Sequence, residues 1–205
     1  MRALRLSIAI LACIAGPAAA ADLAVSVKGD DGRPLADAVV IVRPAAGIAA
    51  GQPIRYAWPL MMTQQNIAFN PYVLIVPLGS TVGFPNKDKV RHHVYSFSAT
   101  KKFELKLYGQ QEERTVTFDK AGVVALGCNI HDSMIGYIFV SDSPYAAKTN
   151  AAGEAVIRGI PAGAATVSTW HPDMKALKPV AGPMAVGGRQ AVVLVMRPAA
   201  MRHQH

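Results

Sequence analysis

The feature of this sequence that most constrains its fold is the recurrence of short β-rich segments separated by Gly, Pro, Asn and Asp. Apolar residues at helical spacing are nearly absent, so long helices are not expected. Many short strands at this spacing are typical of an all-β sandwich. The expected strands are residues 23–27, 38–42, 72–76, 81–84, 93–97, 114–118, 123–126, 136–140, 155–157, 165–170 and 190–196.

Two segments at opposite ends of the chain share one pattern of polar turn, strand, turn and strand. The first covers residues 22–44 and the second covers residues 142–198. Together they resemble the halves of one small β-sandwich of the prealbumin-like or carboxypeptidase-regulatory type, with residues 45–141 inserted as a second domain. One continuous, elaborated sandwich is the alternative. We expect residues 44–70 to form a loop that leads into the inserted domain, and residues 199–205 to be a disordered tail.

The first 21 residues have the composition of a secretory signal peptide. Arg2 and Arg5 precede a short apolar run, and small residues at positions 17–21 provide an Ala-x-Ala type cleavage site. This run is too short to span a bilayer and no later stretch is long enough, so no transmembrane segment is expected. We therefore expect export to the periplasm. Cys13 gives a weaker indication of lipid anchoring. Removal of both arginines lowers the formal net charge from +8 to +6.

Cys128 is the residue that points most directly to chemistry. Because Cys13 lies in the expected signal peptide, Cys128 is a lone thiol in an oxidising compartment, where cysteines normally form bridged pairs. An inert core thiol, an intermolecular disulfide or a metal ligand would each account for it. Its neighbours favour a ligand, since Cys128, His131 and Met134 have the spacing C-x2-H-x2-M in a tight loop between two expected strands.

A thiolate, two imidazoles and a weak thioether make up the ligand set of a mononuclear blue-copper site. The thiolate suits Cu(I) and the imidazoles suit Cu(II), so both oxidation states are held with little rearrangement. The second imidazole has to come from upstream, where His92 and His93 are adjacent candidates. Strand alternation sends these two side chains to opposite faces, although a bulge could reverse them.

Zinc, a binuclear copper site and a nucleophilic thiol fit the same residues less well. Cys and His bind zinc well, but structural zinc sites take Cys, His or carboxylate where this chain offers Met134. A binuclear copper site needs a second bridging cysteine, and no arrangement of Asn or Asp supports a nucleophilic Cys-His triad. Without a metal, Cys128 would be a core thiol, His131 and Met134 would pack in a loop, and the upstream histidines would form a surface pair.

The sequence around these residues resembles the cupredoxin family. Asn86 and Asp88, then His92 and Val94, precede the Cys, His and Met in an order similar to that of plastocyanin, pseudoazurin and amicyanin. The C-x2-H-x2-M spacing is similar to that of amicyanin in particular. The resemblance covers about residues 65–141. Its longest runs also resemble exported cupredoxin-domain proteins often labelled methylamine utilization proteins.

The resemblance implies a Greek-key cupredoxin β-sandwich that holds one copper ion cycling between Cu(I) and Cu(II). It assigns the upstream ligand to His92, the axial position to Met134, and the exposed end of the site, which passes the electron to a partner, to His131. It gives Asn86 a supporting role as the residue that ties the two ligand loops together by hydrogen bonds. His93, adjacent to the ligand, is expected in a supporting position as well.

These expectations describe an exported electron carrier, not an enzyme, with unidentified redox proteins as donor and acceptor. A copper-binding protein that stores, delivers or senses the metal without redox turnover is the alternative. A third hypothesis makes the flanking sandwich a docking module whose fold the copper helps to hold. The family presents an apolar patch to its partners beside the exposed histidine ligand, whereas this chain has the charged residue Asp132 next to His131. Nucleic-acid binding is not expected, because the basic residues are scattered and no nucleic-acid module is recognised.

Several further residues could bind a metal but are expected to have ordinary structural roles. Met61 and Met62 lie beside Trp58 in the sequence and are expected to pack. His171 ends an expected strand, and the histidines at the end of the chain, His203 and His205, lie in the expected tail. The basic residues around the upstream histidines form either a rim for an acidic partner or a solvated loop. They are Lys87, Lys89, Arg91, Lys101 and Lys102.

Overall fold

A computed structural model describes residues 20–48, 53–176 and 178–197. The expected signal peptide lies outside these residues except for its last two positions, which begin the first strand. The expected tail also lies outside them. Within the described ranges, no helix is long and apolar enough to cross a membrane. The described residues form sixteen strands in five sheets, so the predicted all-β class is confirmed.

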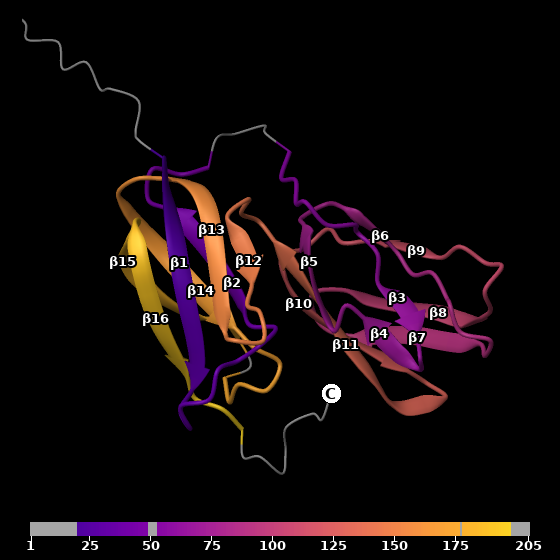
Figure 1. The fold of residues 1–205 in the computed structure, drawn as a ribbon. Coiled ribbons are helices and arrows are strands. Elements are labelled where there is room, and N and C mark those ends of the chain that lie inside the picture. Colours follow the sequence, from indigo (N-terminus) through magenta and orange to yellow (C-terminus); the bar gives the residue numbers. More distant parts are fainter. Residues whose placement is uncertain (1–19, 49–52, 177, 198–205) are drawn as a thin grey trace, which may run out of the picture.

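Strands from both ends of the chain build one β-sandwich, which we call the flanking sandwich (Figure 1). One of its sheets has the order β13-β1-β16, and the other has the order β12-β2-β14-β15. Strand β1 pairs antiparallel with β13 and parallel with β16, so the first and the last described strands share one sheet. The strands are β1 (Ala20–Gly29), β2 (Val39–Pro44), β12 (Ala146–Lys148), β13 (Glu154–Pro161), β14 (Ala164–Trp170), β15 (Val180–Ala185) and β16 (Gly188–Leu194).

The intervening strands build a second β-sandwich, the central sandwich. Its main sheet has the order β5-β11-β10-β7-β8, with β5 parallel to β11 and the other pairs antiparallel. Two short ladders, β3-β4 and β6-β9, lie against one face of this sheet and share its buried core. The strands are β3 (Thr63–Gln65), β4 (Ala68–Asn70), β5 (Val73–Pro77), β6 (Thr81–Gly83), β7 (His92–Phe97), β8 (Lys102–Tyr108), β9 (Thr115–Thr117), β10 (Gly122–Cys128) and β11 (His131–Ser141).

The segment between the two sandwiches differs from the sequence-based expectation. Residues 44–70 were expected to form a loop, but they include the β3-β4 hairpin, so that prediction was wrong for the second half of the segment. Each of these strands has three residues and buries a single side chain, Gln64 or Phe69. Three residues are too few to show an alternating pattern, and a buried glutamine interrupts the apolar signal.

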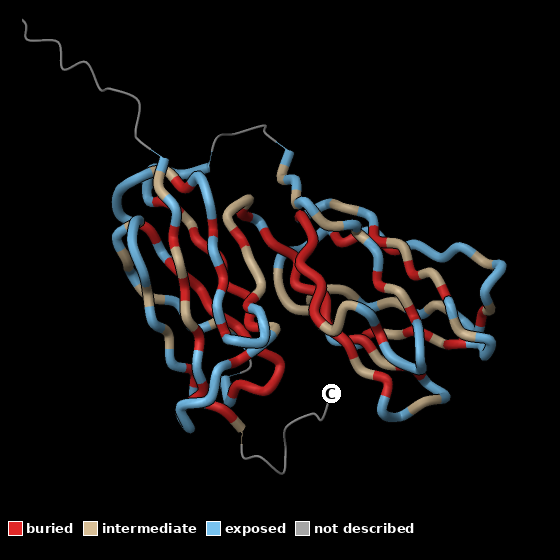
Figure 2. The backbone as a smooth tube through the Cα atoms, viewed as in Figure 1, coloured by how far each residue is buried: buried red, intermediate tan, exposed pale blue. Residues whose placement is uncertain are grey.

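The main sheet of the central sandwich contributes apolar side chains to two separate buried cores. Figure 2 shows buried residues along β5 and β11. On β11, Ile138 faces the core that contains Cys128, whereas Tyr137 and Phe139 belong to a core shared with the flanking sandwich. The ring of Trp170, from β14, lies 5.4 Å from that of Tyr137 and 5.9 Å from that of Phe139. Continuous apolar strands are typical of sheets that are covered on both sides, and the flanking sandwich covers the part of this face formed by β5 and β11.

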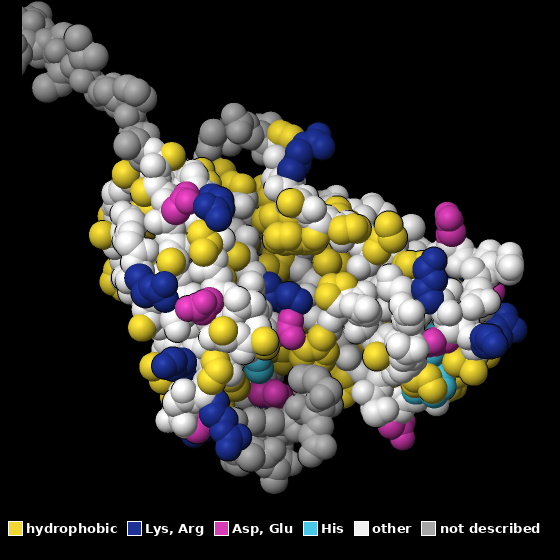
Figure 3. All heavy atoms as spheres, viewed as in Figure 1, with side chains coloured by type: hydrophobic (Ala, Val, Ile, Leu, Met, Phe, Trp, Pro, Cys, Tyr) yellow, Lys and Arg dark blue, Asp and Glu magenta, His cyan; other side chains and the backbone are white. Residues whose placement is uncertain are grey.

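An apolar hollow lies where the two sandwiches meet, and Figure 3 shows hydrophobic side chains gathered there. Trp58, Met61, Pro71 and Ile75 line it from the central sandwich, and Lys148 lines it from the flanking one. The indole of Trp58 donates a hydrogen bond to the backbone oxygen of Ile75 at 2.7 Å. This bond fixes the chain that enters the central sandwich against β5.

Gly136 provides a test of packing in the central sandwich. A Cβ atom at this position in β11 would lie 2.7 Å from the Cβ of Phe69, which is buried in β4. We expect Gly136→Ala to lower the free energy of unfolding of the metal-free protein by about 1–3 kcal/mol, the usual cost of overpacking. Gly182→Ala, in β15, is the control because nothing lies within 4 Å of its added Cβ. Equal denaturant midpoints for the two variants would contradict the prediction.

Candidate metal centre

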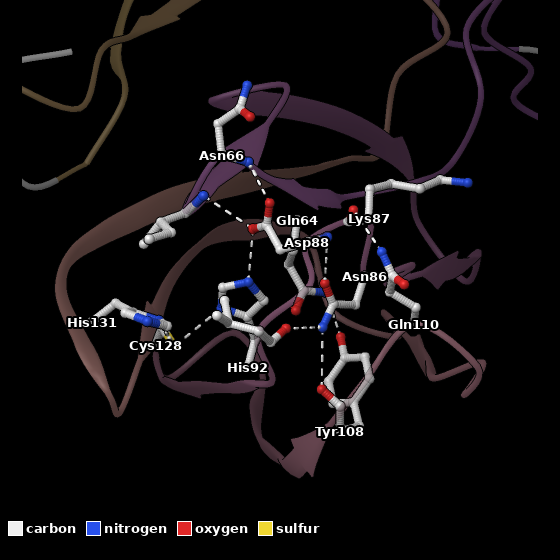
Figure 4. A network of polar contacts seen from close by, with 12 residues as sticks. Gln64, Asn66, Asn86, Lys87, Asp88, His92, Tyr108, Gln110, Cys128 and His131 are labelled. Carbon is white, nitrogen blue, oxygen red and sulfur yellow. Dashed lines mark hydrogen bonds and ion pairs between the residues drawn. The ribbon is translucent and has the colours of Figure 1, made fainter.

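Three side chains converge at one end of the central sandwich. Ligand atoms of His92, Cys128 and His131 all lie within 4.8 Å of one another. The Nδ1 atom of His131 lies 3.5 Å from the sulfur of Cys128, and the Nδ1 atom of His92 lies 3.8 Å from it (Figure 4). Both imidazoles therefore present the same ring nitrogen to one thiol. A thiolate with two imidazole nitrogens around a common point can hold a soft or borderline metal ion.

The hairpin between β10 and β11 places two of these residues. Cys128 is the last residue of β10 and His131 is the first of β11, and the two are paired across the ladder. Asn129 and Ile130 form the connection between them. A bulge between Gly127 and Cys128 shifts the register at the end of the hairpin. The C-x2-H spacing is therefore the geometry of a two-residue hairpin connection, in which the paired residues lie side by side.

The upstream histidine comes from the neighbouring strand. His92 begins β7, and Val94 on the same face is paired with Cys128 of β10. The ring of His93 points to the opposite face, where its Nε2 atom lies 2.8 Å from the Oε1 atom of Glu104. Of the two adjacent candidates, the side chain of His92 is the one that joins the cluster. The backbone of His93 still contributes, because its carbonyl oxygen accepts a hydrogen bond of 3.1 Å from the amide of Asn129.

Burial divides the proposed ligands into two kinds. His92, Cys128 and Met134 are 0%, 3% and 1% exposed, and Met134 belongs to the same core cluster as Cys128. His131 is half-buried and follows Ile130, which is 50% exposed. A metal ion in this position would be shielded from water on the core side. The ring of His131 gives the centre an edge near the surface.

Asn86 fixes the loop that leads to His92. Its side-chain amide donates to the backbone oxygens of Val90 at 2.9 Å and Tyr108 at 3.2 Å, and its Oδ1 atom accepts from the amide of Asp88 at 2.8 Å. These bonds hold the loop closed and attach it to the end of β8. None of these three bonds reaches the segment with Cys128 and His131. That segment is joined to β7 by the β7-β10 ladder and by the bond from the Asn129 amide to the His93 carbonyl.

Asp88 is the residue of this centre whose role sequence reasoning missed. Its Oδ2 atom lies 2.8 Å from the Nε2 atom of His92, and its carboxylate also accepts from the amides of Asn66 at 2.7 Å and Ile67 at 3.0 Å (Figure 4). Burial works to raise the pKa of Asp88, but the hydrogen bonds from Ile67, His92 and Asn66 outweigh it and hold this pKa below its usual value. An acidic residue four positions before a candidate ligand was the available signal.

A cluster of buried polar side chains lies beneath the loop that carries Asn86 and Asp88. The hydroxyl of Tyr108 donates to the backbone oxygen of Phe84 at 2.8 Å, and the side-chain amide of Gln64 donates both to this hydroxyl and, at 3.1 Å, to the same carbonyl. Tyr108 and Gln64 are both fully buried. This group connects β3 and the end of β8 to the segment that precedes Asn86.

The remaining possible ligands lie away from the cluster. Met62 is buried in the core, and Met61 is half exposed beside the apolar hollow. The ring of His171 is buried in the flanking sandwich, where Nδ1 accepts from the amide of Asp173 at 3.0 Å and Nε2 lies 3.0 Å from the oxygen of Ala36. The two histidines at the end of the chain lie outside the described residues.

Comparison with known proteins gives matches to solved structures. No family model matches the chain, and no curated protein matches it. A copper-containing nitrite reductase from Thermus scotoductus SA-01 is 28% identical, with a TM-score of 0.39, over 46% of this chain and 25% of its own. A purple cupredoxin from Nitrosopumilus maritimus is 24% identical, with a TM-score of 0.35, over 40% of this chain and 96% of its own. A reduced variant of amicyanin is 22% identical, with a TM-score of 0.37, over 51% of this chain and 99% of its own. This chain thus spans a quarter of the length of the nitrite reductase.

The buried tyrosine beneath the centre predicts a loss of stability in alkali. Burial raises the pKa of Tyr108 to about 12, whereas the pKa of a tyrosine in the unfolded chain is about 10. Between these values the folded protein retains a proton that the unfolded chain releases, so the free energy of unfolding falls as the pH rises through this window. We expect Tyr108→Phe to lose less stability between pH 10 and 12 than the wild type, as measured by denaturant unfolding of the metal-free protein. Parallel losses in both proteins would refute this role for Tyr108.

Proposed function

We propose that this protein is an exported electron carrier with one mononuclear blue-copper site, held by His92, Cys128, His131 and Met134. The observation that carries the proposal is the approach of two imidazole Nδ1 atoms to one buried thiol, at 3.5 and 3.8 Å. Two imidazoles and a thiolate with a weak thioether are the ligands of blue-copper centres. The burial of Met134 in the same core cluster as Cys128 supports a thioether as the fourth ligand.

Each ligand has a separate task in this proposal. Copper, when bound, supplies a one-electron couple between Cu(I) and Cu(II). The Cys128 thiolate provides the strongest covalent contact, and the fully buried ring of His92 keeps water away from the core side. The half-buried ring of His131 offers a route from the centre to the surface. Met134 would hold the ion weakly through its thioether and so adjust the reduction potential.

Preorganisation favours electron transfer over a looser metal-binding role. The hairpin places Cys128 opposite His131, and hydrogen bonds hold both the loop before His92 and the ring itself. Side chains held by such contacts need little rearrangement when the charge of the ion changes. A low reorganisation energy is what fast one-electron transfer requires.

The redox partners are proposed by chemical class. An electron donor and an electron acceptor would both meet the exposed edge beside His131, where Ile130 offers an apolar contact and Asp132 a charged one. We propose carriage of electrons, not conversion of a substrate. The resemblance to proteins labelled methylamine utilization proteins identifies neither partner.

The visible spectrum of the copper-loaded protein tests the site. We expect an intense thiolate-to-copper absorption band and a reversible one-electron titration, with Cys128→Ser abolishing the band. His92→Ala should strongly reduce copper binding. The matched control, His93→Ala, should leave the band unchanged because this ring contacts Glu104 on the other face of β7. Absence of the band in the wild type would overturn the proposal, and tight Cu(I) binding without it would favour copper storage or delivery.

We also propose that the protein acts in the periplasm after removal of residues 1–21. The proposal rests on the basic start, short apolar run and small-residue cleavage site of this segment. Expressed with its full N-terminus in a Gram-negative host, the protein should be recovered from the periplasmic fraction with Asp22 as its first residue, as measured by intact mass. A cytoplasmic full-length product, or a product lipidated at Cys13, would contradict it.

A further inference from the structure

We propose that Asp88 is a positioning residue of the metal centre, whose carboxylate fixes the ring of His92 and ties it to the turn between β3 and β4. This inference rests on the proposed function, because it concerns how one of the proposed copper ligands is held. It goes further by naming the group that sets the orientation and electron donation of that ligand. The contacts come from three segments that are distant in the sequence.

The two ring nitrogens of His92 have separate partners. Nδ1 faces the sulfur of Cys128 at 3.8 Å, and Nε2 lies 2.8 Å from the Oδ2 atom of Asp88. A nitrogen that binds a metal ion has to be unprotonated, so the proton of the neutral ring belongs on Nε2, which then donates to the carboxylate. The ring is fully buried and the carboxylate is 12% exposed, so water competes little for this bond.

The carboxylate is itself held in place. Its Oδ1 atom accepts from the amide of Asn66, and its Oδ2 atom accepts from the amide of Ile67 as well as lying against the ring. The backbone amide of Asp88 donates to Oδ1 of Asn86, whose own amide group is bonded to the end of β8. The position of the carboxylate therefore depends on the β3-β4 turn, the loop before β7 and β8 together (Figure 4).

The turn that presents these two amides has an unfavourable backbone conformation. Asn66 and Ile67 have φ angles of 58° and 55°, in the left-handed region. Asparagine tolerates this region, but a β-branched residue such as Ile67 rarely adopts it. Two successive residues with positive φ aim both amides at one carboxylate. Strained conformations persist where surrounding contacts compensate for them, and the two bonds to Asp88 are such contacts.

A carboxylate in this position affects the ligand in two ways. It prevents rotation of the imidazole, which keeps Nδ1 directed at the sulfur of Cys128. Its negative charge, acting through the Nε2 proton, increases the electron donation of Nδ1 to a bound ion. Greater donation stabilises Cu(II) more than Cu(I), so Asp88 should lower the reduction potential of the centre.

The adjacent histidine supplies a matched control. The Nε2 atom of His93 lies 2.8 Å from Glu104, the same distance that separates His92 from Asp88. This second pair lies on the outer face of the sheet, and the Glu104 side chain is 54% exposed. Asp88→Asn and Glu104→Gln thus remove equal charges from two neighbouring histidines, only one of which is a proposed ligand.

The experiment compares these variants in the mature chain loaded with copper. We expect Asp88→Asn to keep the blue band but to lose about 10–100-fold in Cu(II) affinity, the usual cost of removing such a partner. A tenfold loss that is specific to Cu(II) raises the potential by about 59 mV. Glu104→Gln should change neither quantity. In the copper-free protein, Asp88→Asn should shift the amide resonances of Asn66 and Ile67 and speed exchange of the His92 Nε2 proton.

The outcomes separate this inference from the proposed function. A wild type without the blue band would refute copper electron transfer, whereas a blue wild type with an unchanged Asp88→Asn potential would refute the positioning role alone. If Asp88→Asn does not fold, the copper-free wild type decides, by nitrogen-edited NMR of the imidazoles. A slowly exchanging Nε2 proton on His92 supports the inference, and a proton on Nδ1 overturns it.

Discussion

The antiparallel pairing of β10 with β11 on one side and β7 on the other is the constraint on which the metal centre depends. It places Cys128 opposite His131 in one ladder and opposite Val94 in the other. Gly127 permits the close approach of these strands, because a Cβ atom there would lie 2.8 Å from the ring of Tyr95. With these pairings in place, alternation along β7 puts His92 on the same face of the sheet as Val94 and Cys128.

The second face of the same sheet shows why the two sandwiches are one structure. Strand β11 begins with His131 at the metal centre and continues into the region where Tyr137 and Phe139 pack on Trp170 of the flanking sandwich. The strand that carries a proposed ligand is therefore buried from Gly136 to Ser141, beyond its exposed end at the metal centre. Close packing of this kind resists local deformation. A centre that is to exchange electrons without rearranging benefits from such a support.

Hydrogen bonds complete the support on the opposite side of the centre. Asp88 and Asn86 hold the ligand loop, and Tyr108 with Gln64 fills the space beneath it. Buried polar groups are costly without partners, so the bonds from Gln64 Nε2, Tyr108 and Asn86 favour one arrangement over its alternatives. The side chains that surround the proposed copper site thus specify its geometry before any ion binds.

The sequence by itself determined the all-β class, because that class depends on local periodicity, and from short spacing it predicted the flanking segments and a metal site on the loop with Cys128, His131 and Met134. Alternation along one strand also predicted that the side chains of His92 and His93 lie on opposite faces of the sheet. Only a bulge could have exchanged the two faces. The β3-β4 hairpin and the role of Asp88 were decided by the tertiary structure. The two hairpin strands are too short to show a pattern. Asp88 bonds to residues about twenty positions away, and no local pattern specifies which backbone amides a carboxylate will meet. The same reason applies to the shared core, since only folding brings Trp170 to β11.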